Sequence, residues 1–259
     1  MSNQSLYGRS DIATGYAGES NLQAPEETIL RELIPFLPTA KMLDIGVGGG
    51  RTTLHFAKWV SEYVGVDYAE RMVEACRRRF AGYPDTISFQ VCDARSMEQF
   101  EADSFDFVLF SYNGIDCIDH EGRLTVLQEV GRVGKSGGTF AFSSHNLNSA
   151  VNFFEWRRMI SLDPRRLRRT VKRLFLRFVY NRDVKLGTVR NSAHTLLSDR
   201  SYRCKMQHYY IRPLAQIEQL KEHFTDVRVF SLITGSEIKD MAELETVEDN
   251  WLYYLCRIK

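Results

Sequence analysis

The chain lacks the features that mark disulfide-bonded, metal-binding and membrane-spanning proteins. It has only five cysteines, which lie far apart without a C-x-x-C pair, and its six histidines show no metal-ligand spacing. No apolar run approaches the roughly 20 residues that a membrane-spanning helix needs. The first 20 residues are polar and lack the apolar core of a signal peptide. We therefore expect a cytoplasmic chain without a disulfide framework, a metal site or a membrane span.

The chain also lacks an overall charge bias. Its formal net charge is +1, so the molecule as a whole shows no preference for nucleic acid or for membranes. Its 259 residues, 44% of them hydrophobic, suffice for one sizeable core, or for a core with an appended subdomain.

Short apolar strands and amphipathic helices alternate from residue 25 to residue 145. The spacing predicts strands over 41–46, 63–67, 86–93, 104–113 and 137–146, with helices over 25–34, 51–61, 69–82 and 121–133. Such alternation is typical of β-α-β crossovers, which produce a parallel sheet with helices on both faces. The class predicted is therefore α/β, with a doubly wound and mostly parallel sheet.

The alternation stops after residue 145 and resumes at residue 213. A helix is predicted over 213–224, a strand over 226–233 and a last strand over 251–259. Because no helix separates these two strands, we expect the last strand to run antiparallel to its neighbour and to complete a seven-stranded sheet. The expected organisation is an N-terminal arm (1–24), a core (25–145 and 213–259) and a helical or irregular insertion (146–212).

One turn in the core has the composition of a ligand-binding loop. In "LDIGVGGGRTT", Asp44 precedes the pattern G-x-G-x-G formed by Gly46, Gly48 and Gly50. A strand, a glycine turn and a helix N-terminus bring free N–H groups together, and glycine permits positive φ and close ligand approach. The third glycine of the dinucleotide fingerprint would fall on Arg51, and the G-K-[ST] of a P-loop is absent. Asp44 either organises this turn or binds a cationic group of the ligand.

At this turn and in three later segments the sequence resembles the class I S-adenosylmethionine-dependent methyltransferases. "VGVDYAERMVEAC" is similar to the family's second motif, "FQVCDARSM" to its third, and "FDFVLFSYNGID" to its fourth strand. The resemblance covers residues 25–145 and 213–259, with the motifs in the family's order. It implies S-adenosyl-L-methionine as cofactor, methyltransferase activity, and the antiparallel last strand that the pattern predicts.

The resemblance also implies individual roles. Asp67 matches the acid that binds the two ribose hydroxyls, a role that suits a carboxylate about 20 residues past a glycine turn. Asp93 matches the acid that accepts from the adenine amino group, and Ala94 matches the residue whose N–H meets the ring. The other expected cofactor-binding positions are Asp44, Gly46, Gly48, Gly50, Tyr68, Met72, Ser111 and, in the N-terminal arm, Tyr16.

The sequence favours a small-molecule acceptor that is methylated at oxygen or nitrogen. Residues 113–116 read N-G-I-D, which departs from the N/D-P-P-Y/F motif of enzymes that methylate nucleic-acid bases or glutamine. Two alternatives stay open: an RNA methyltransferase, and a non-catalytic module that binds the cofactor. No pattern in the sequence indicates an oligomeric state.

A general base is needed only if the acceptor carries a proton that it does not release unaided. His145 is the main candidate, because it follows the fifth strand and ligands of open α/β sheets bind at the carboxyl ends of the strands. Tyr112 is the second catalytic candidate. His194, His208 and Asp116 are lesser ones.

The insertion carries a concentrated positive charge. Residues 156–190 hold twelve lysines and arginines against two aspartates, a balance of +10, which leaves −9 for the rest of the chain. Within this window, apolar residues follow the spacing of an amphipathic helix: Leu167, Val171, Leu174, Phe175 and Phe178. Three interpretations are open: a lid that packs over the sheet and covers the substrate, peripheral contact with an anionic membrane, and contact with RNA phosphates.

Overall fold

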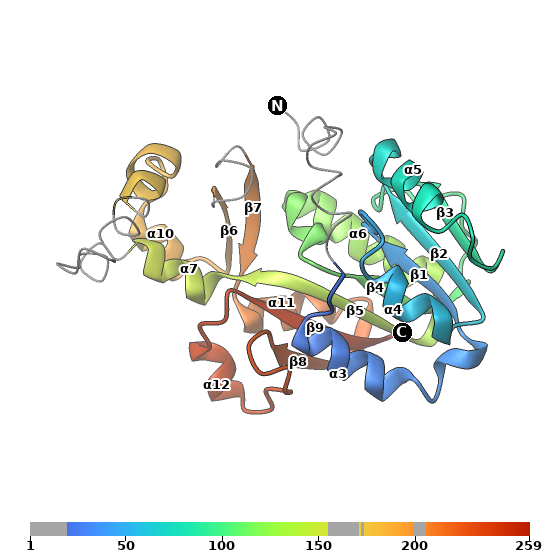
Figure 1. Ribbon diagram of the computed structural model, residues 1–259. Coiled ribbons are helices and arrows are strands. Elements are labelled where there is room, and N and C mark those ends of the chain that lie inside the picture. Colours follow the sequence, from blue (N-terminus) through green and yellow to red (C-terminus); the bar gives the residue numbers. More distant parts are fainter. Residues whose placement is uncertain (1–19, 155–170, 172–173, 199–205) are drawn as a thin grey trace.

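The computed structural model describes residues 20–154, 171, 174–198 and 206–259. Its centre is one nine-stranded sheet, in which seven strands follow the order β3-β2-β1-β4-β5-β9-β8 and two further strands continue from the end of β5 (Figure 1). Strands β1 to β5 pair with their neighbours in parallel, and β9 is antiparallel to both β5 and β8. The mostly parallel sheet and its antiparallel last strand are therefore confirmed, whereas the sheet has two strands more than the seven predicted. The bounds are β1 Lys41–Ile45, β2 Glu62–Asp67, β3 Ile87–Val91, β4 Phe105–Phe110, β5 Gly134–Asn146, β8 Phe224–Ser231 and β9 Trp251–Ile258.

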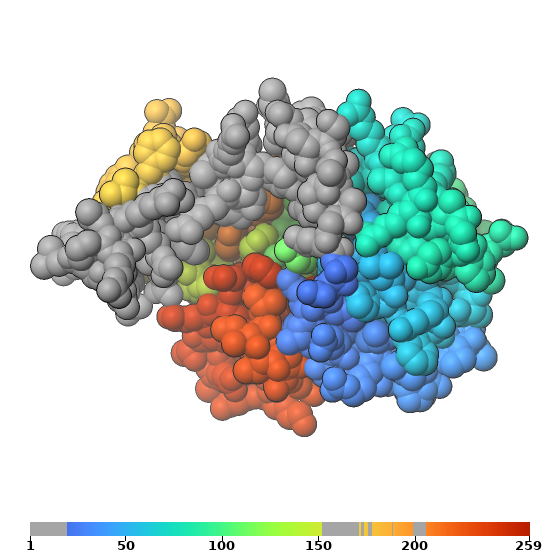
Figure 2. Space-filling view, viewed as in Figure 1, coloured from blue at the N-terminus to red at the C-terminus, as the bar shows by residue number. Residues whose placement is uncertain are grey.

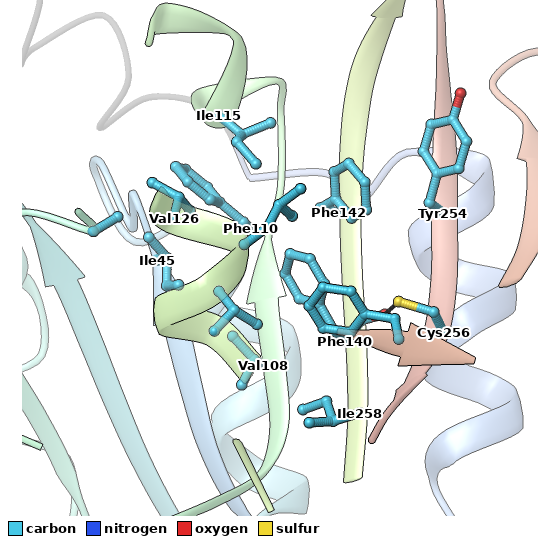
Figure 3. Close-up of a cluster of buried hydrophobic side chains, with 14 of the residues drawn as sticks. Ile45, Val108, Phe110, Ile115, Val126, Phe140, Phe142, Tyr254, Cys256 and Ile258 are labelled. Carbon is cyan, nitrogen blue, oxygen red and sulfur yellow. Dashed lines mark hydrogen bonds between the residues drawn. The ribbon is translucent and has the colours of Figure 1, made fainter. Parts of the chain in front are cut away.

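Helices cover both faces of this sheet because successive strand residues point to opposite sides. Val108 and Phe110 join one apolar cluster with α6, α11 and α12, whereas Phe107 and Leu109 join another with α3, α4 and α5. Figure 3 shows the first cluster, with side chains of β1, β4, β5 and β9 gathered on one face. The bounds are α3 Ala24–Leu33, α4 Thr53–Phe56, α5 Glu70–Arg79, α6 His120–Val133, α11 Pro213–Leu220 and α12 Met241–Thr246.

The first described helix packs against the last third of the chain. In Figure 2 the blue residues of the N-terminal part lie beside the red residues of the C-terminal part. Ion pairs at this contact join Arg228 of β8 to Glu32 of α3 at 2.7 Å and to Glu237 at 2.6 Å. The N-terminal helix thus belongs to the same packed body as β8 and β9.

Two strands that the sequence pattern did not predict lie in the insertion. Strands β6 (His194–Ser198) and β7 (Gln207–Ile211) form an antiparallel pair, which we call the β6–β7 hairpin. β7 pairs with the end of β5, where His145 lies opposite Tyr210 on one edge and Trp251 of β9 on the other. β7 therefore pairs with the same edge of β5 as β4 does, but nearer to the carboxyl end of β5. The other described elements of the insertion are helical: α7 Leu147–Phe154, the π-helix η4 Leu176–Tyr180 and α10 Leu186–Asn191.

A buried charge network joins the elements around the end of β5. Arg123 of α6 is fully buried and donates to Asp116 at 2.6 Å and to Ser144 at 3.0 Å. Asp116 lies in η3 (Gly114–Cys117), a short 3-10 helix after β4. Burial alone would raise the pKa of Asp116, but the Arg123 guanidinium and His145 hold it below its usual range. The network thus fixes η3 to α6 and β5.

Removal of Arg123 should leave the Asp116 carboxylate buried without its cation. We expect Arg123→Ala to lower the free energy of unfolding by about 3–5 kcal/mol in urea denaturation. The matched control is Lys221→Ala, because Lys221 forms an exposed ion pair with Glu218, and exposed pairs contribute about 0–1 kcal/mol. Equal losses in the two variants would contradict a structural role for the buried network.

Candidate functional site

A cavity of about 740 Å³ lies where the carboxyl ends of the parallel strands meet the β6–β7 hairpin. Its volume falls in the range of about 300–1,000 Å³ that is typical of small-molecule sites. One side is formed by the turn after β1 and by the ends of β2, β3 and β4, and the other includes residues of η3 and the hairpin. The predicted positions in its wall are Asp44, Gly46, Gly48, Asp67, Tyr68, Met72, Asp93, Ala94, Ser111 and Tyr112.

The glycine turn adopts the conformation that its composition predicts. Gly46, Gly48 and Gly50 have φ values of 66°, 54° and 76°, which L-residues rarely adopt. A Cβ on Gly50 would stand 2.5 Å from the Phe80 ring, and one on Gly46 would stand 2.9 Å from Phe110. Gly46 and Gly48 line the cavity, whereas Gly50 lies in the turn but outside the cavity wall.

The buried side chain of Asp44 stabilises the glycine turn. Its carboxylate accepts hydrogen bonds from the hydroxyls of Thr52 and Tyr63 and is 1% exposed. Burial raises the pKa of Asp44 to about 6, against the opposing effect of these two hydrogen bonds. Of the two roles predicted for Asp44, organising the turn is the one that these contacts show.

Asp67 lies at the end of β2 with capacity left for a ligand. One carboxylate oxygen accepts from the Gly48 N–H at 3.1 Å and the other from the Ala69 N–H at 2.9 Å. A carboxylate has about four acceptor sites, so these backbone bonds leave about two. Burial raises the pKa of Asp67 to about 6, although both N–H groups favour the ionised form. Tyr68 and Met72 line the same side of the cavity.

Asp93 and Ala94 also lie in the cavity wall, after β3. The Asp93 carboxylate already forms an ion pair with Arg95, with 2.6 Å between Nη2 and Oδ2, and this hydrogen-bonded pair lowers the pKa of Asp93. The two side chains are 42% and 53% exposed, and an exposed pair contributes little stability. Arg95 was not among the predicted site residues. A ligand that donates a hydrogen bond to the Asp93 carboxylate has to do so beside the ion pair with Arg95.

A buried network that the sequence analysis missed joins α3 to the turn. Arg51 donates to both carboxylate oxygens of Glu26 at 2.6 Å. Ser111 donates to the same carboxylate, accepts from Arg51 at 3.0 Å and contacts the Tyr253 hydroxyl at 2.9 Å. Burial opposes ionisation of Glu26, but Arg51 holds its pKa below the usual range. The sequence feature that could have pointed to this network is Arg51, which stands where the third glycine of the dinucleotide fingerprint would fall.

The two catalytic candidates lie in different surroundings. Tyr112 lines the cavity with a left-handed backbone (φ 55°), and its ring lies 5.1 Å from the Arg51 guanidinium. His145 lies outside the wall of this cavity, with its ring 6.1 Å from that of Trp251. Its Nδ1 is 2.7 Å from Asp116 Oδ2. The structure therefore places Tyr112 at the cavity and pairs His145 with a buried carboxylate beside it.

The hairpin contributes three residues to the cavity wall: Leu196, Ser198 and Gln207. No sequence motif marked them. Of the lesser candidates, His194 lies on β6 and His208 is buried on β7.

Other predicted features fall partly or wholly outside the described residues. Tyr16 lies outside them, and so does about half of the basic window 156–190, namely residues 156–170, 172 and 173. Where the window is described, Val171, Phe175 and Phe178 are 57%, 54% and 60% exposed, so this part of the apolar stripe is not buried against the sheet. Within the parts of the chain that the structure describes, no helix is both long and apolar enough to span a bilayer.

Comparison with known proteins agrees with this geometry. Residues 42–138 match the methyltransferase domain family model. The chain is 36% identical over 107 residues to the uncharacterized methyltransferase YcgJ of Bacillus subtilis, a match that covers 40% of each chain. It is 34% identical over 108 residues to ajmaline N-methyltransferase of Rauvolfia serpentina, covering 40% of this chain and 35% of the relative. The matches thus span less than half the length of these relatives.

Solved structures extend the likeness of fold to nearly the whole chain. An S-adenosylmethionine-dependent methyltransferase from Mesorhizobium loti aligns over 90% of this chain and 97% of its own, with a TM-score of 0.58 and 18% identity. The glycopeptide N-methyltransferase MtfA in complex with S-adenosyl-L-homocysteine aligns over 97% and 98%, with a TM-score of 0.57 and 14% identity. Residues 42–138 therefore match a methyltransferase domain, and the fold of nearly the whole chain is that of these solved methyltransferases.

Proposed function

We propose that this chain transfers the methyl group of S-adenosyl-L-methionine to an oxygen or nitrogen of a small-molecule acceptor. The observation that carries the proposal is the shared cavity: the glycine turn and Asp67 line one side, and residues of the β6–β7 hairpin line another. One cavity can therefore hold a cofactor and a small acceptor together. We propose the segment 146–212 as the part of the chain that provides the acceptor side.

The residues present fit the cofactor. Asp67 keeps about two acceptor sites for vicinal hydroxyls, and the glycine turn presents backbone without side chains to the same cavity. When bound, S-adenosyl-L-methionine supplies a methyl group already activated by a positive sulfur. The protein has to hold the acceptor close to that methyl group and exclude water.

We assign a contact with the acceptor to Tyr112 of the core, and the uptake of the acceptor's proton to His145. Tyr112 lines the cavity, and its backbone is left-handed. The lowered pKa of Asp116 makes it an acceptor, so His145 Nδ1 donates to it. Nε2, which lies 3.4 Å from the Asn113 side-chain nitrogen, is then the ring nitrogen that can accept a proton. In this orientation His145 can act as a general base toward a protonated oxygen or nitrogen. Its place outside the cavity wall means that a proton has to reach it through a neighbouring group.

The names of the relatives do not indicate which atom of the acceptor this chain methylates. They include an N-methyltransferase, a C-methyltransferase and an O-methyltransferase. The test is a metabolite panel incubated with the full chain and methyl-labelled cofactor, followed by mass spectrometry of the products. Label transfer to a small molecule supports the proposal. Label transfer to RNA alone, or to no acceptor, would favour one of the two alternatives.

The first prediction concerns the ribose contact. Asp67→Ala should weaken the binding of S-adenosyl-L-homocysteine by about 1.5–3 kcal/mol, because hydrogen bonds to a charged acceptor are lost. Isothermal titration calorimetry measures this change. The control is Glu70→Ala, three residues along the chain and exposed, which should bind as the unmodified chain does. Unchanged affinity of Asp67→Ala would mean that the ribose lies elsewhere.

The second prediction concerns pH. The pKa of Asp67 is about 6, so this carboxyl becomes protonated as pH falls below 6 and accepts fewer hydrogen bonds. Hydroxyl donors favour the ionised form, so affinity should rise as pH increases through 6. We expect S-adenosyl-L-homocysteine to bind about tenfold more weakly at pH 5 than at pH 7.5. Asp67→Asn should lose most of this dependence, and an equally steep dependence in that variant would contradict the assignment.

The third prediction separates proton transfer from cofactor binding. With an acceptor found in the panel, His145→Gln should lower kcat by about 10²- to 10⁴-fold if His145 is the base. The affinity for S-adenosyl-L-homocysteine should stay unchanged in the same variant. A kcat within a factor of two of the unmodified chain would exclude this role.

A further inference from the structure

Two histidines stack across the boundary between the core and the hairpin. His120 begins α6 in the core, and His194 begins β6. Their ring centroids are 4.1 Å apart and the planes differ by 5°. Tyr209 of β7 lies parallel to both, with centroids 5.0 Å from His194 and 5.8 Å from His120. Its hydroxyl is 2.7 Å from His120 Nδ1.

This stack is of interest because few backbone strand pairs join the hairpin to the core. Among the described residues, β6 pairs with β7 alone, and β7 pairs with β5 at two positions, His145–Tyr210 and Asn146–Ile211. The cavity residues Leu196 and Ser198 follow His194 on the same short strand. The stack therefore adds a side-chain contact between α6 and the start of β6, beside the apolar cluster that Leu197 and Tyr210 form with α7 and α10 and the two hydrogen bonds between Ser198 and Asn181.

The surroundings of the stack disfavour additional positive charge. The Arg123 guanidinium lies 4.8 Å from the centre of the Tyr209 ring, and its own charge is paired with Asp116. Two acids flank His120 in the chain: Asp119, whose side chain caps the helix by accepting from the Gly122 N–H, and Glu121 in the first turn of α6. Burial lowers the pKa of His194, and the neighbouring His120 and Arg123 lower it further. Tyr209 stays neutral, because burial raises its pKa to about 12.

We propose that the stack of His120 and His194 forms a latch that positions the hairpin side of the acceptor site and releases it when His194 is protonated. This inference rests on the proposed function in assigning that side of the cavity to the acceptor. The neutral His194 ring stacks on His120 with 4.1 Å between the centroids, whereas its imidazolium would be partly buried there close to the positive charge of Arg123, so protonation weakens the latched position. His120 and His194 are positioning residues, since neither lies in the cavity wall.

The direction of the pH effect follows from the lowered pKa of His194. The latched state resists protonation, whereas a released histidine takes up a proton near its ordinary value of 6.5. The latch should therefore be stable above pH 6.5 and weaken as pH falls below that value.

Cys117 provides a reporter that needs neither cofactor nor acceptor. Its thiol belongs to the cavity wall, on η3, and β7 packs against η3. The experiment measures the rate at which N-ethylmaleimide modifies Cys117 in the full chain, by peptide mass spectrometry, at pH 5.5, 6.5 and 7.5. His194→Phe keeps a stacking ring that cannot be protonated. The comparison of the two chains at the same pH cancels the pH dependence of the thiol.

We expect equal rates in the two chains at pH 7.5 and at least about threefold faster modification of the unmodified chain at pH 5.5. The control His223→Phe replaces another partly buried histidine, outside the stack, and should follow the unmodified chain. A rate ratio that does not change with pH would overturn the proposal and leave the stack a purely structural contact.

A second measurement covers the case in which His194→Phe does not fold. The ring of His194 in the unmodified chain should titrate below 6.5 by NMR, and the excess modification of Cys117 at low pH should follow that titration. Titration at or above 6.5 would also overturn the proposal. Because no ligand is present, either result is independent of whether the chain binds S-adenosyl-L-homocysteine.

Discussion

The cavity exists because β1 and β4 are neighbours in the sheet although β2 and β3 lie between them in the chain. From β1 the chain winds outward in one direction through β2 and β3, and from β4 it winds in the other direction through β5. The connections after β1 and β4 therefore pass to opposite faces and leave a crevice at their carboxyl ends. The glycine turn and Asp67 lie on one side of this crevice, and Tyr112 and η3 lie on the other.

Two buried ion pairs fix the segments on either side of that crevice. Arg51 and Glu26 join the glycine turn to α3, whereas Arg123 and Asp116 join η3 to α6. A buried charge that loses its partner costs several kcal/mol, so each pair strongly disfavours rearrangement of the loop that carries it. The same Asp116 orients His145, so the proposed base takes its orientation from a group that also holds the fold together.

Much of the cavity wall around the glycine turn could be predicted because its residues lie at the ends of successive strands. Asp44 lies near the end of one strand, Gly48 follows that strand and Asp67 ends the next, so their shared edge follows from the strand pattern alone. The acceptor side could not be predicted in this way. Leu196 and Gln207 reach the cavity only because β5 continues past the end of β4 and offers β7 an edge to pair with. Neither residue belongs to a local motif.

The sequence by itself determined the α/β class, the antiparallel last strand and the glycine turn, since hydrophobic period and glycine spacing are local properties of the chain. Only the tertiary structure decided which charges are buried together. Glutamate and arginine usually lie at the surface, and Glu26 and Arg51 become a buried pair only because α3 packs beside the turn. Contacts between residues far apart in the chain also place His120 against His194 and His145 outside the cavity wall, because such pairings depend on how the elements dock.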